Sequence, residues 1–186
     1  MSENLRRYQE ALYGMNAVLV RVDPSRWDEP SKCDEWSCRE VLGHVIWHMN
    51  EIAARLEQSD PPPEQPEAQV AGDDPVGSWT TALDRVLTAL DQPGALQQQV
   101  TGPFGPSTVD DRLAISMADA FTHTWDIAAA LDMPHGLRQD TAAAIHGRLE
   151  GAGDALRQPG LLGPATDAPA GADAVERYVS FAGRSI

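Results

Sequence analysis

The sequence predicts an all-α protein: a four-helix bundle with a long crossover after its second helix and extra helices near its C-terminus. Three observations predict this fold. Apolar residues recur at three- and four-residue steps in four long segments, which is the period of an amphipathic helix. A polar, proline-rich stretch over residues 59–76 separates the second segment from the third and can cross the end of a bundle. No segment of useful length alternates between apolar and polar residues, as a half-buried strand would.

The first two helices are expected over residues 3–22 and 37–57. The second has the clearer start, because Ser37 and Glu40 fit a capping box, in which the two side chains satisfy each other's free backbone amides. Apolar side chains fall on one face of each helix. They are Leu5, Tyr8, Leu12, Met15, Leu19 and Val22 in the first, and Val41, Val45, Met49, Ile52 and Leu56 in the second.

The remaining elements follow from the same period and from turn residues. The stretch QQQVTGPFGPSTV is rich in Gly and Pro and indicates a loop or a short hairpin. On the fifth helix, Glu150 and Asp154 are four residues apart and are expected on a solvated acidic face. We expect the third helix over residues 76–91, the fourth over 109–131, the fifth over 139–156 and a short terminal helix in DAVERYVSFAGR.

Length and charge narrow the class of protein. The chain has 186 residues, which suits one domain over residues 1–186. It carries 14 Lys and Arg against 28 Asp and Glu, a formal net charge of −14. This acidity argues against binding to nucleic acid, which needs clustered Lys and Arg, and against binding to an anionic membrane surface.

The N-terminus and the cysteines suggest a cytoplasmic protein. The first residues, MSENLRRYQEALYGM, lack the charged start and apolar run of a signal peptide, and no stretch approaches the length of a membrane span. Two cysteines, Cys33 and Cys38, do not make a disulfide framework and lack a paired C-x₂-C pattern for zinc. We expect reduced thiols in the cytoplasm, and either a monomer or a homodimer.

Two pairs of polar residues accompany the apolar stripes. His44 and His48 are four residues apart in the second helix, and Asp119 and His123 are four apart in the fourth. Each pair lies on one helix face, along or beside the apolar stripe, so both can point into the bundle. Two imidazoles and a carboxylate from facing helices suit a divalent metal. Catalytic zinc sites use three protein ligands and leave one position open, and iron or nickel accepts similar ligands.

Helix spacing alone leaves other interpretations open. The same groups could form a hydrogen-bonded polar network, or one pair could face solvent. Asp126 could orient the His123 imidazole from behind, cap a neighbouring element, or pair with an Arg. His48 could be a fourth ligand, line the site, or flank the core. The tryptophans are expected to be core or helix-start aromatics rather than a stacking platform; they include Trp36, Trp47, Trp79 and Trp125.

Three motifs add a family resemblance. WDEPSKCDEWSCREVLGHV, DAFTHTWDIAAALDMP and DAVERYVSFAGR occur in this order and resemble the metal-binding domain of mycothiol-dependent maleylpyruvate isomerases, in the DinB-like superfamily. The resemblance covers most of the chain and implies a DinB-like bundle. It also implies a divalent metal, usually zinc, bound by His44, Asp119 and His123.

The sequence departs from this family in two respects. The family's glutamate ligand is Asp119 here, so the helix must approach the metal by about one methylene more. The full isomerase also carries a C-terminal domain that helps to form its substrate site, and Ile186 comes too early for one. The resemblance therefore supports the metal domain and its general chemistry rather than maleylpyruvate as the substrate.

The function expected from these observations is a metal-dependent thiol transferase or isomerase. A low-molecular-weight thiol such as mycothiol would take the fourth ligand position. Free thiols titrate near pH ~8.5, whereas a coordinated thiol is deprotonated and can attack an electrophile. In this hypothesis His48 is a proton acceptor lining the pocket and Asp126 orients His123.

Two alternatives remain. One is metal-assisted hydrolysis, with bound water as the nucleophile. The other is a non-catalytic, stress-related bundle that binds a metal or another ligand. Its signature would be a closed site in which His44, His48, Asp119 and His123 all bind.

Overall fold

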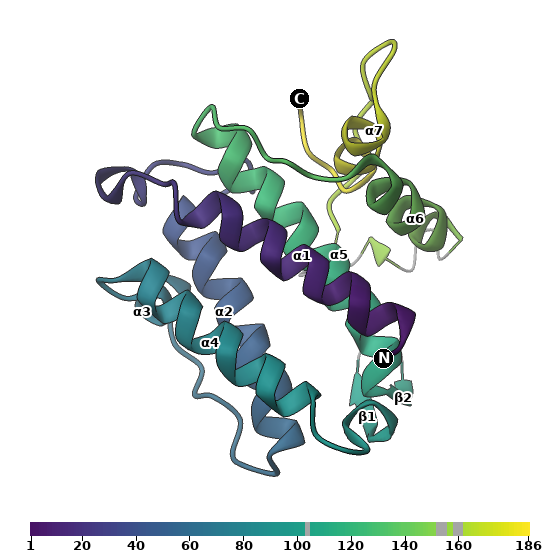
Figure 1. Ribbon diagram of the computed structural model, residues 1–186. Helices are drawn as coiled ribbons and strands as arrows, with labels where there is room; N and C mark the ends of the chain where they lie inside the picture. The colour runs from purple at the N-terminus through teal and green to yellow at the C-terminus, as the bar shows by residue number, and fades with distance from the viewer. Residues whose placement is uncertain (103–104, 152–155, 158–161) are drawn as a thin grey trace.

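The computed structural model describes residues 1–102, 105–151, 156–157 and 162–186. Four long helices form a bundle, as expected (Figure 1). In the figure, α1 lies along α5, while α2 lies between α4 and α5. The four helices are α1 (Glu3–Leu19), α2 (Cys38–Leu56), α4 (Pro75–Leu90) and α5 (Val109–Ala130). The predicted all-α fold with a crossover between the second and third long helices is confirmed.

Shorter elements join and extend the bundle. They are the 3₁₀ helices η1 (Pro24–Arg26) and η2 (Ala95–Gln97), the helices α3 (Glu67–Ala71), α6 (Gln139–Glu150) and α7 (Ala174–Phe181), and the strands β1 (Gln99–Gly102) and β2 (Gly105–Thr108). The two strands pair antiparallel, which confirms the short hairpin. Helix α6 ends earlier than the expected residue 156, and residues 152–155, with Asp154, lie outside the described residues.

The crossover differs from the expected irregular connection, because it contains the short helix α3. This helix follows Pro66, whose φ of −54° is close to helical, and has Glu67 in its first turn. It packs against α2 at Gly43, where an added Cβ would overlap the backbone carbonyl of Glu67. The contact with α2 therefore decides this turn of helix, since five residues are too few for a stable isolated helix.

Polar caps fix where α2 and α5 begin. The Ser37 hydroxyl accepts a hydrogen bond from the Glu40 amide at 3.3 Å, and the Glu40 carboxylate accepts one from the Ser37 amide at 2.8 Å. The predicted capping box is thus confirmed. Thr108 and Asp111 make the same reciprocal pair at the start of α5. Both helices that carry the candidate site therefore have a defined first turn.

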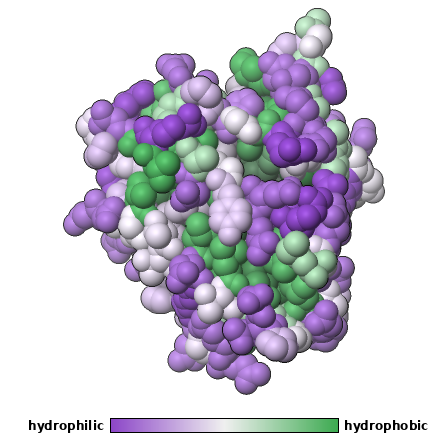
Figure 2. All heavy atoms as spheres, viewed as in Figure 1, coloured by the Kyte–Doolittle hydropathy of each residue, from purple (hydrophilic) through white to green (hydrophobic). Residues whose placement is uncertain are grey.

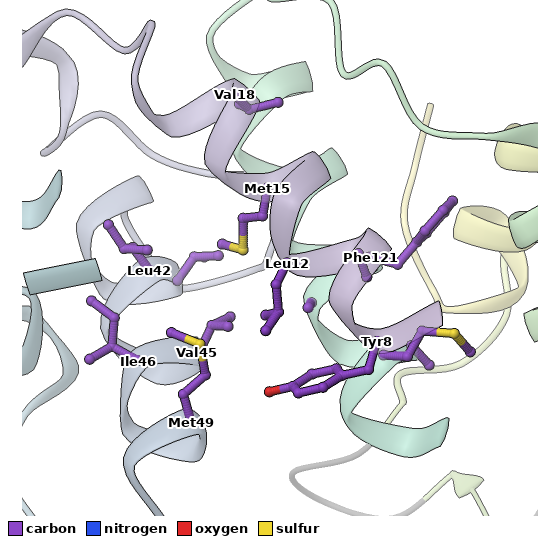
Figure 3. Close-up of a cluster of buried hydrophobic side chains, with 14 of the residues drawn as sticks. Tyr8, Leu12, Met15, Val18, Leu42, Val45, Ile46, Met49 and Phe121 are labelled. Carbon is purple, nitrogen blue, oxygen red and sulfur yellow. The ribbon is translucent and has the colours of Figure 1, made fainter. Parts of the chain in front are cut away.

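The core lies between α1, α2 and α5, where buried side chains from the three helices meet (Figure 3). Burying one such side chain contributes about 1.5–3 kcal/mol to folding. Trp79 of α4 is also fully buried, and its indole nitrogen donates to Asn16 Oδ1 at 3.1 Å. The core side chains labelled in the figure are Tyr8, Leu12, Met15, Val18, Leu42, Val45, Ile46, Met49 and Phe121.

Helices α6 and α7 pack on each other beside α5 (Figure 1). Hydrophilic side chains surround smaller hydrophobic areas on the face that Figure 2 shows. None of the described helices is both long and apolar enough to cross a lipid bilayer. The four long helices thus form the scaffold, and the C-terminal helices cover one side of α5.

Candidate metal centre

Helices α2 and α5 bring three potential metal ligands together. The Oδ1 atom of Asp119 lies 3.4 Å from His44 Nε2 and 3.3 Å from His123 Nε2. The two imidazole ring centroids are 5.1 Å apart. One ligand atom from each residue lies within 4.8 Å of the other two. The two predicted helix faces therefore do point toward each other, across the α2–α5 interface.

These distances fit a divalent cation. Ligands about 2.0–2.1 Å from a zinc ion in a tetrahedral arrangement lie roughly 3.3–3.4 Å apart, as the Asp119 oxygen does from both nitrogens. The Asp119 side chain, although shorter than a glutamate, thus reaches both imidazole nitrogens. Two imidazole nitrogens and one carboxylate oxygen also form a donor set that zinc, iron and nickel accept.

Behind His123, a buried carboxylate fixes the ring. Asp126 is fully buried, and its Oδ2 atom lies 2.9 Å from His123 Nδ1. Since an ionised carboxylate only accepts hydrogen bonds, Nδ1 donates, which leaves Nε2 directed at Asp119. Arg184 binds the same carboxylate at two points, with Nε 2.9 Å from Oδ1 and Nη2 2.7 Å from Oδ2. Asp126 therefore makes the hydrogen bond that its hypothesised orienting role requires, and Arg184 holds Asp126 in turn.

The charges at the centre favour a cation. Burial would raise the pKa of Asp119, but the adjacent His123 and His44 outweigh burial and hold that pKa well below its usual value. The pKa of Asp126 is likewise lowered, by His123 and Arg184 against the effect of burial. Burial lowers the pKa of His44, which favours the neutral imidazole that a metal requires. Two ionised carboxylates thus flank His123, and Arg184 supplies the countercharge only for Asp126.

The remaining ligand, His123, has the opposite pKa shift. Burial disfavours its charged form, but the carboxylates of Asp119 and Asp126 outweigh burial and raise the pKa of His123 to about 9. The two carboxylates therefore favour a positive charge on or beside the His123 ring at neutral pH. A divalent cation bound at Nε2 would replace the proton that otherwise balances these carboxylates.

A cavity of about 460 Å³ opens in front of the three ligands. His44, Asp119 and His123 line one wall of this cavity, which we call the central cavity. Trp36 lies over the site, with its ring centroid 4.9 Å from that of His44. The other walls come from the loop before α2, from α5 and from C-terminal residues; they include Lys32, Cys33, Ile115, Leu149, Tyr178 and Arg184. Most of this surface is apolar, with a few charged groups.

His48 does not line the central cavity. Its ring lies next to that of His44, with centroids 4.5 Å apart, and its Nδ1 is 3.7 Å from Glu51 Oε2. It lines two neighbouring cavities instead: one of about 540 Å³, shared with His44 and Trp47, and one of about 300 Å³. Among the described residues, His48 is not grouped with the other three ligands, so the arrangement is open rather than closed by a fourth histidine.

A second set of donor atoms, from Cys33, His123 and Asp126, also lies within 4.8 Å. Its members are already engaged, since Asp126 binds both His123 and Arg184. Burial raises the pKa of the Cys33 thiol to about 11, which disfavours the thiolate that metals bind. The set with Asp119 is therefore the better metal site.

No local sequence pattern predicts three features of the centre. Arg184 is far from Asp126 in the chain, and only the need of a buried carboxylate for a cation predicts some arginine there. Trp36 packs against the core, as expected, but its contact with the His44 ring has no local signal. Tyr178 lines the central cavity, and its hydroxyl lies 2.8 Å from Thr122 Oγ1. Each of these positions depends on how the C-terminal segment and the loop before α2 fold over α5.

Comparisons with known proteins agree with this architecture. Two uncharacterized proteins of Mycobacterium tuberculosis, Rv0738 of strain H37Rv and MT0763 of strain CDC 1551, are each 25% identical over 126 residues. These matches cover 68% of this chain and 66% of each relative, so the chain spans just under two thirds of their length.

A crystal structure of a histidine-to-alanine mutant of mycothiol-dependent maleylpyruvate isomerase has the same fold. Its TM-score is 0.59 at 17% identity, with 76% of this chain and 67% of that chain covered. The family model described as the mycothiol maleylpyruvate isomerase N-terminal domain matches residues 9–128, which include all three candidate ligands and Asp126. The chain belongs to the mycothiol maleylpyruvate isomerase N-terminal domain family.

Proposed function

We propose that the chain binds one divalent cation, zinc in the first instance, through His44, Asp119 and His123, and that this centre serves a thiol-dependent transfer or isomerisation of a small electrophile. The observation that carries the proposal is the meeting of three ligand atoms at the wall of the central cavity, with the Asp119 oxygen 3.3–3.4 Å from both imidazole nitrogens. When bound, the cation would keep a coordinated thiol deprotonated at neutral pH, as a nucleophile.

The residues behind the centre hold the ligands ready. Asp126 keeps the Nδ1 proton of His123, so that Nε2 offers its lone pair to the centre. Arg184 balances the charge of Asp126 and fixes its plane with two hydrogen bonds. Trp36 packs on His44 and restricts the rotation of that ring. Little rearrangement is then needed when the cation and the thiol bind.

The central cavity can hold both reactants. Its volume of about 460 Å³ lies within the roughly 300–1,000 Å³ of ordinary small-molecule sites. Apolar side chains such as Ile115 and Leu149 exclude water from the space beside the ligands, and Lys32 places a positive charge at the same cavity. Mycothiol is the thiol in the name of the family, so it is the thiol we propose.

His48 has a separate place in the proposal. Because it lies beside His44 but lines the neighbouring cavities, it would accept a proton only from a ligand that extends past His44. We also propose that residues 1–186 act as one unit. Tyr178 and Arg184 lie outside the matched residues 9–128, yet both line the central cavity.

The experiment compares three activities of the purified chain with a measured metal content. It would be assayed for conjugation or isomerisation with mycothiol and an electrophile, maleylpyruvate and chlorodinitrobenzene being the first, and for hydrolysis of model esters and amides. The proposal predicts turnover that requires the thiol and that is lost in His44→Ala and His123→Ala. Thiol-independent hydrolysis would indicate a metal-dependent hydrolase. Metal binding without either activity would indicate a binding module.

A further inference from the structure

A groove between α2 and α5 lies next to the candidate metal centre, on the side of His48. It encloses about 300 Å³, and Val100 and Thr101 of β1 also line it. Its polar lining consists chiefly of His48, Glu51 and Arg55 from α2, and Arg112 and Ser116 from α5. We call it the α2–α5 groove. Its apolar lining includes Ile52 and Leu113, so a ligand there would contact both apolar and charged side chains.

The charge of this groove is unusual for the protein. The chain has twice as many acidic as basic residues, yet two arginines and one carboxylate line the groove. Arg55 is engaged, since its Nη2 lies 2.8 Å from Glu51 Oε1. For Arg112, neither a hydrogen bond nor an ion pair is found within the part of the chain that the structure describes. The same is true of the Ser116 hydroxyl. As far as the described residues go, both side chains can therefore donate to a ligand.

The groove runs toward the metal centre. On α5, Arg112, Ser116 and Asp119 are four and three residues apart and so lie on one helix face. On α2, His44, His48 and Arg55 follow in the opposite direction, because His44 meets Asp119 while Arg55 lines the groove with Arg112. The Cα atoms of Arg112 and Asp119 are about 10 Å apart along the helix axis. A small organic molecule can span this distance.

We propose that the α2–α5 groove binds the anionic end of an organic ligand with an apolar body, with Arg112 as the principal contact and Ser116 as a second hydrogen-bond donor. The planar guanidinium matches the two oxygens of a carboxylate, and a sulfonate offers the same chemistry. The apolar body would lie against Ile52 and Leu113. That the other end of the ligand reaches the metal centre rests on the proposed function; the anion site itself does not.

The test uses two probes of equal shape, phenylbutyrate and phenylbutanamide, which differ in the charge of one end. Their dissociation constants would be measured by calorimetry on the purified full chain of known metal content. We expect the wild type to bind the carboxylate about tenfold more tightly than the amide, as a charge-assisted hydrogen bond implies. Arg112→Gln should lose this preference without weakening amide binding, and Arg112→Lys should keep part of it.

Arg177→Gln is the matched control, because it removes the same charge from an exposed position on α7. It should retain the wild-type preference. Equal affinity for the two probes, no carboxylate binding at millimolar concentration, or a preference that survives Arg112→Gln would overturn the inference. A carboxylate preference in a protein that binds no metal would reject the proposed function and leave the anion site standing. Metal binding and thiol turnover without the carboxylate preference would reject the anion site and leave the proposed function standing.

Discussion

Arg184 forms a two-point ion pair with Asp126, although 58 residues separate them in the chain. The Asp126 oxygen that faces Arg184 Nη2 at 2.7 Å also accepts the Nδ1 proton of His123 at 2.9 Å. The arginine lies three residues after the end of α7, outside the residues that match the family model. The C-terminal segment thus determines the orientation of a candidate metal ligand on α5.

Replacing Arg184 should weaken metal binding. In Arg184→Met, Asp126 loses two hydrogen bonds and its countercharge, so the His123 ring is held less firmly. Loss of a residue that orients a metal ligand typically costs about 10–100-fold in affinity. Competition with a chromophoric chelator would measure the dissociation constant for zinc. The zinc affinity of Arg184→Lys should fall between those of the wild type and Arg184→Met. A lysine ammonium keeps the charge but does not match both carboxylate oxygens as the planar guanidinium does.

The control for this change is Arg177→Met, an exposed arginine on α7 whose loss should leave zinc affinity unchanged. Circular dichroism would establish that each variant is folded, since breaking a buried ion pair costs about 3–5 kcal/mol of stability. A folded Arg184→Met protein with wild-type zinc affinity would show that the ion pair does not position His123.

Two glycines should respond to alanine in opposite directions. In Gly43→Ala the new Cβ would overlap the Glu67 carbonyl, so α3 must move away from α2. We expect a loss of about 1–3 kcal/mol in the free energy of unfolding, as for other overpacked sites. Gly14 lies within α1 with no atom near its added Cβ, so Gly14→Ala should gain about 0.5–1 kcal/mol. Urea unfolding measures the free energy of unfolding of both variants. An equal change in the two variants would mean that α3 does not pack closely on Gly43.

The stability contributed by Glu51 should depend on pH. The adjacent His48, whose Nδ1 lies 3.7 Å from Glu51 Oε2, together with Arg55, outweighs burial and lowers the pKa of Glu51 to about 2. The unfolded carboxyl titrates at pH ~4.3. This contribution is therefore present above that pH and is lost as the pH falls toward 2. The difference in unfolding free energy between the wild type and Glu51→Gln should therefore shrink over this interval. A difference that stays constant from neutral pH to pH ~2 would contradict the assignment.

Both cysteines should react slowly with alkylating reagents at neutral pH. Burial raises the pKa of Cys33 and of Cys38 to about 11, so little of either is thiolate. Cys33 lines the central cavity whereas Cys38 is fully buried, so Cys33 should be modified first. Mass spectrometry after timed exposure to iodoacetamide gives the order. Modification of Cys38 at the rate of an unfolded control would mean that the start of α2 is not packed as described.

Much of the fold could be predicted from local pattern. The apolar period defines the long helices, and the capping box at Ser37 defines where α2 begins, because both depend on neighbours in sequence. Helix α3 could not be predicted, since it depends on a contact with Gly43 rather than on its own five residues. For the same reason, the periodic pattern gave the number of long helices but not how α6 and α7 cover α5.

For the candidate site, too, the local pattern predicted part of the arrangement and the tertiary contacts determined the rest. Spacing placed Asp119 and His123 on one helix face, and the family resemblance selected them with His44 as ligands. The partnership of Asp126 with Arg184 and the separation of His48 from the central cavity required the tertiary structure. From the sequence alone, Asp126 could orient His123, cap a neighbouring element or pair with an Arg. His48 could be a ligand, line the site or flank the core, because contacts between distant segments leave no local pattern.

The measurement that tests the central claim most directly is the metal content of the purified chain and of Asp119→Ala. The account predicts close to one divalent ion per wild-type chain after zinc is supplied and excess is removed, and almost none in a folded Asp119→Ala protein. Substoichiometric metal in the wild type, or equal metal in the two proteins, would contradict the assignment of His44, Asp119 and His123 as a metal centre.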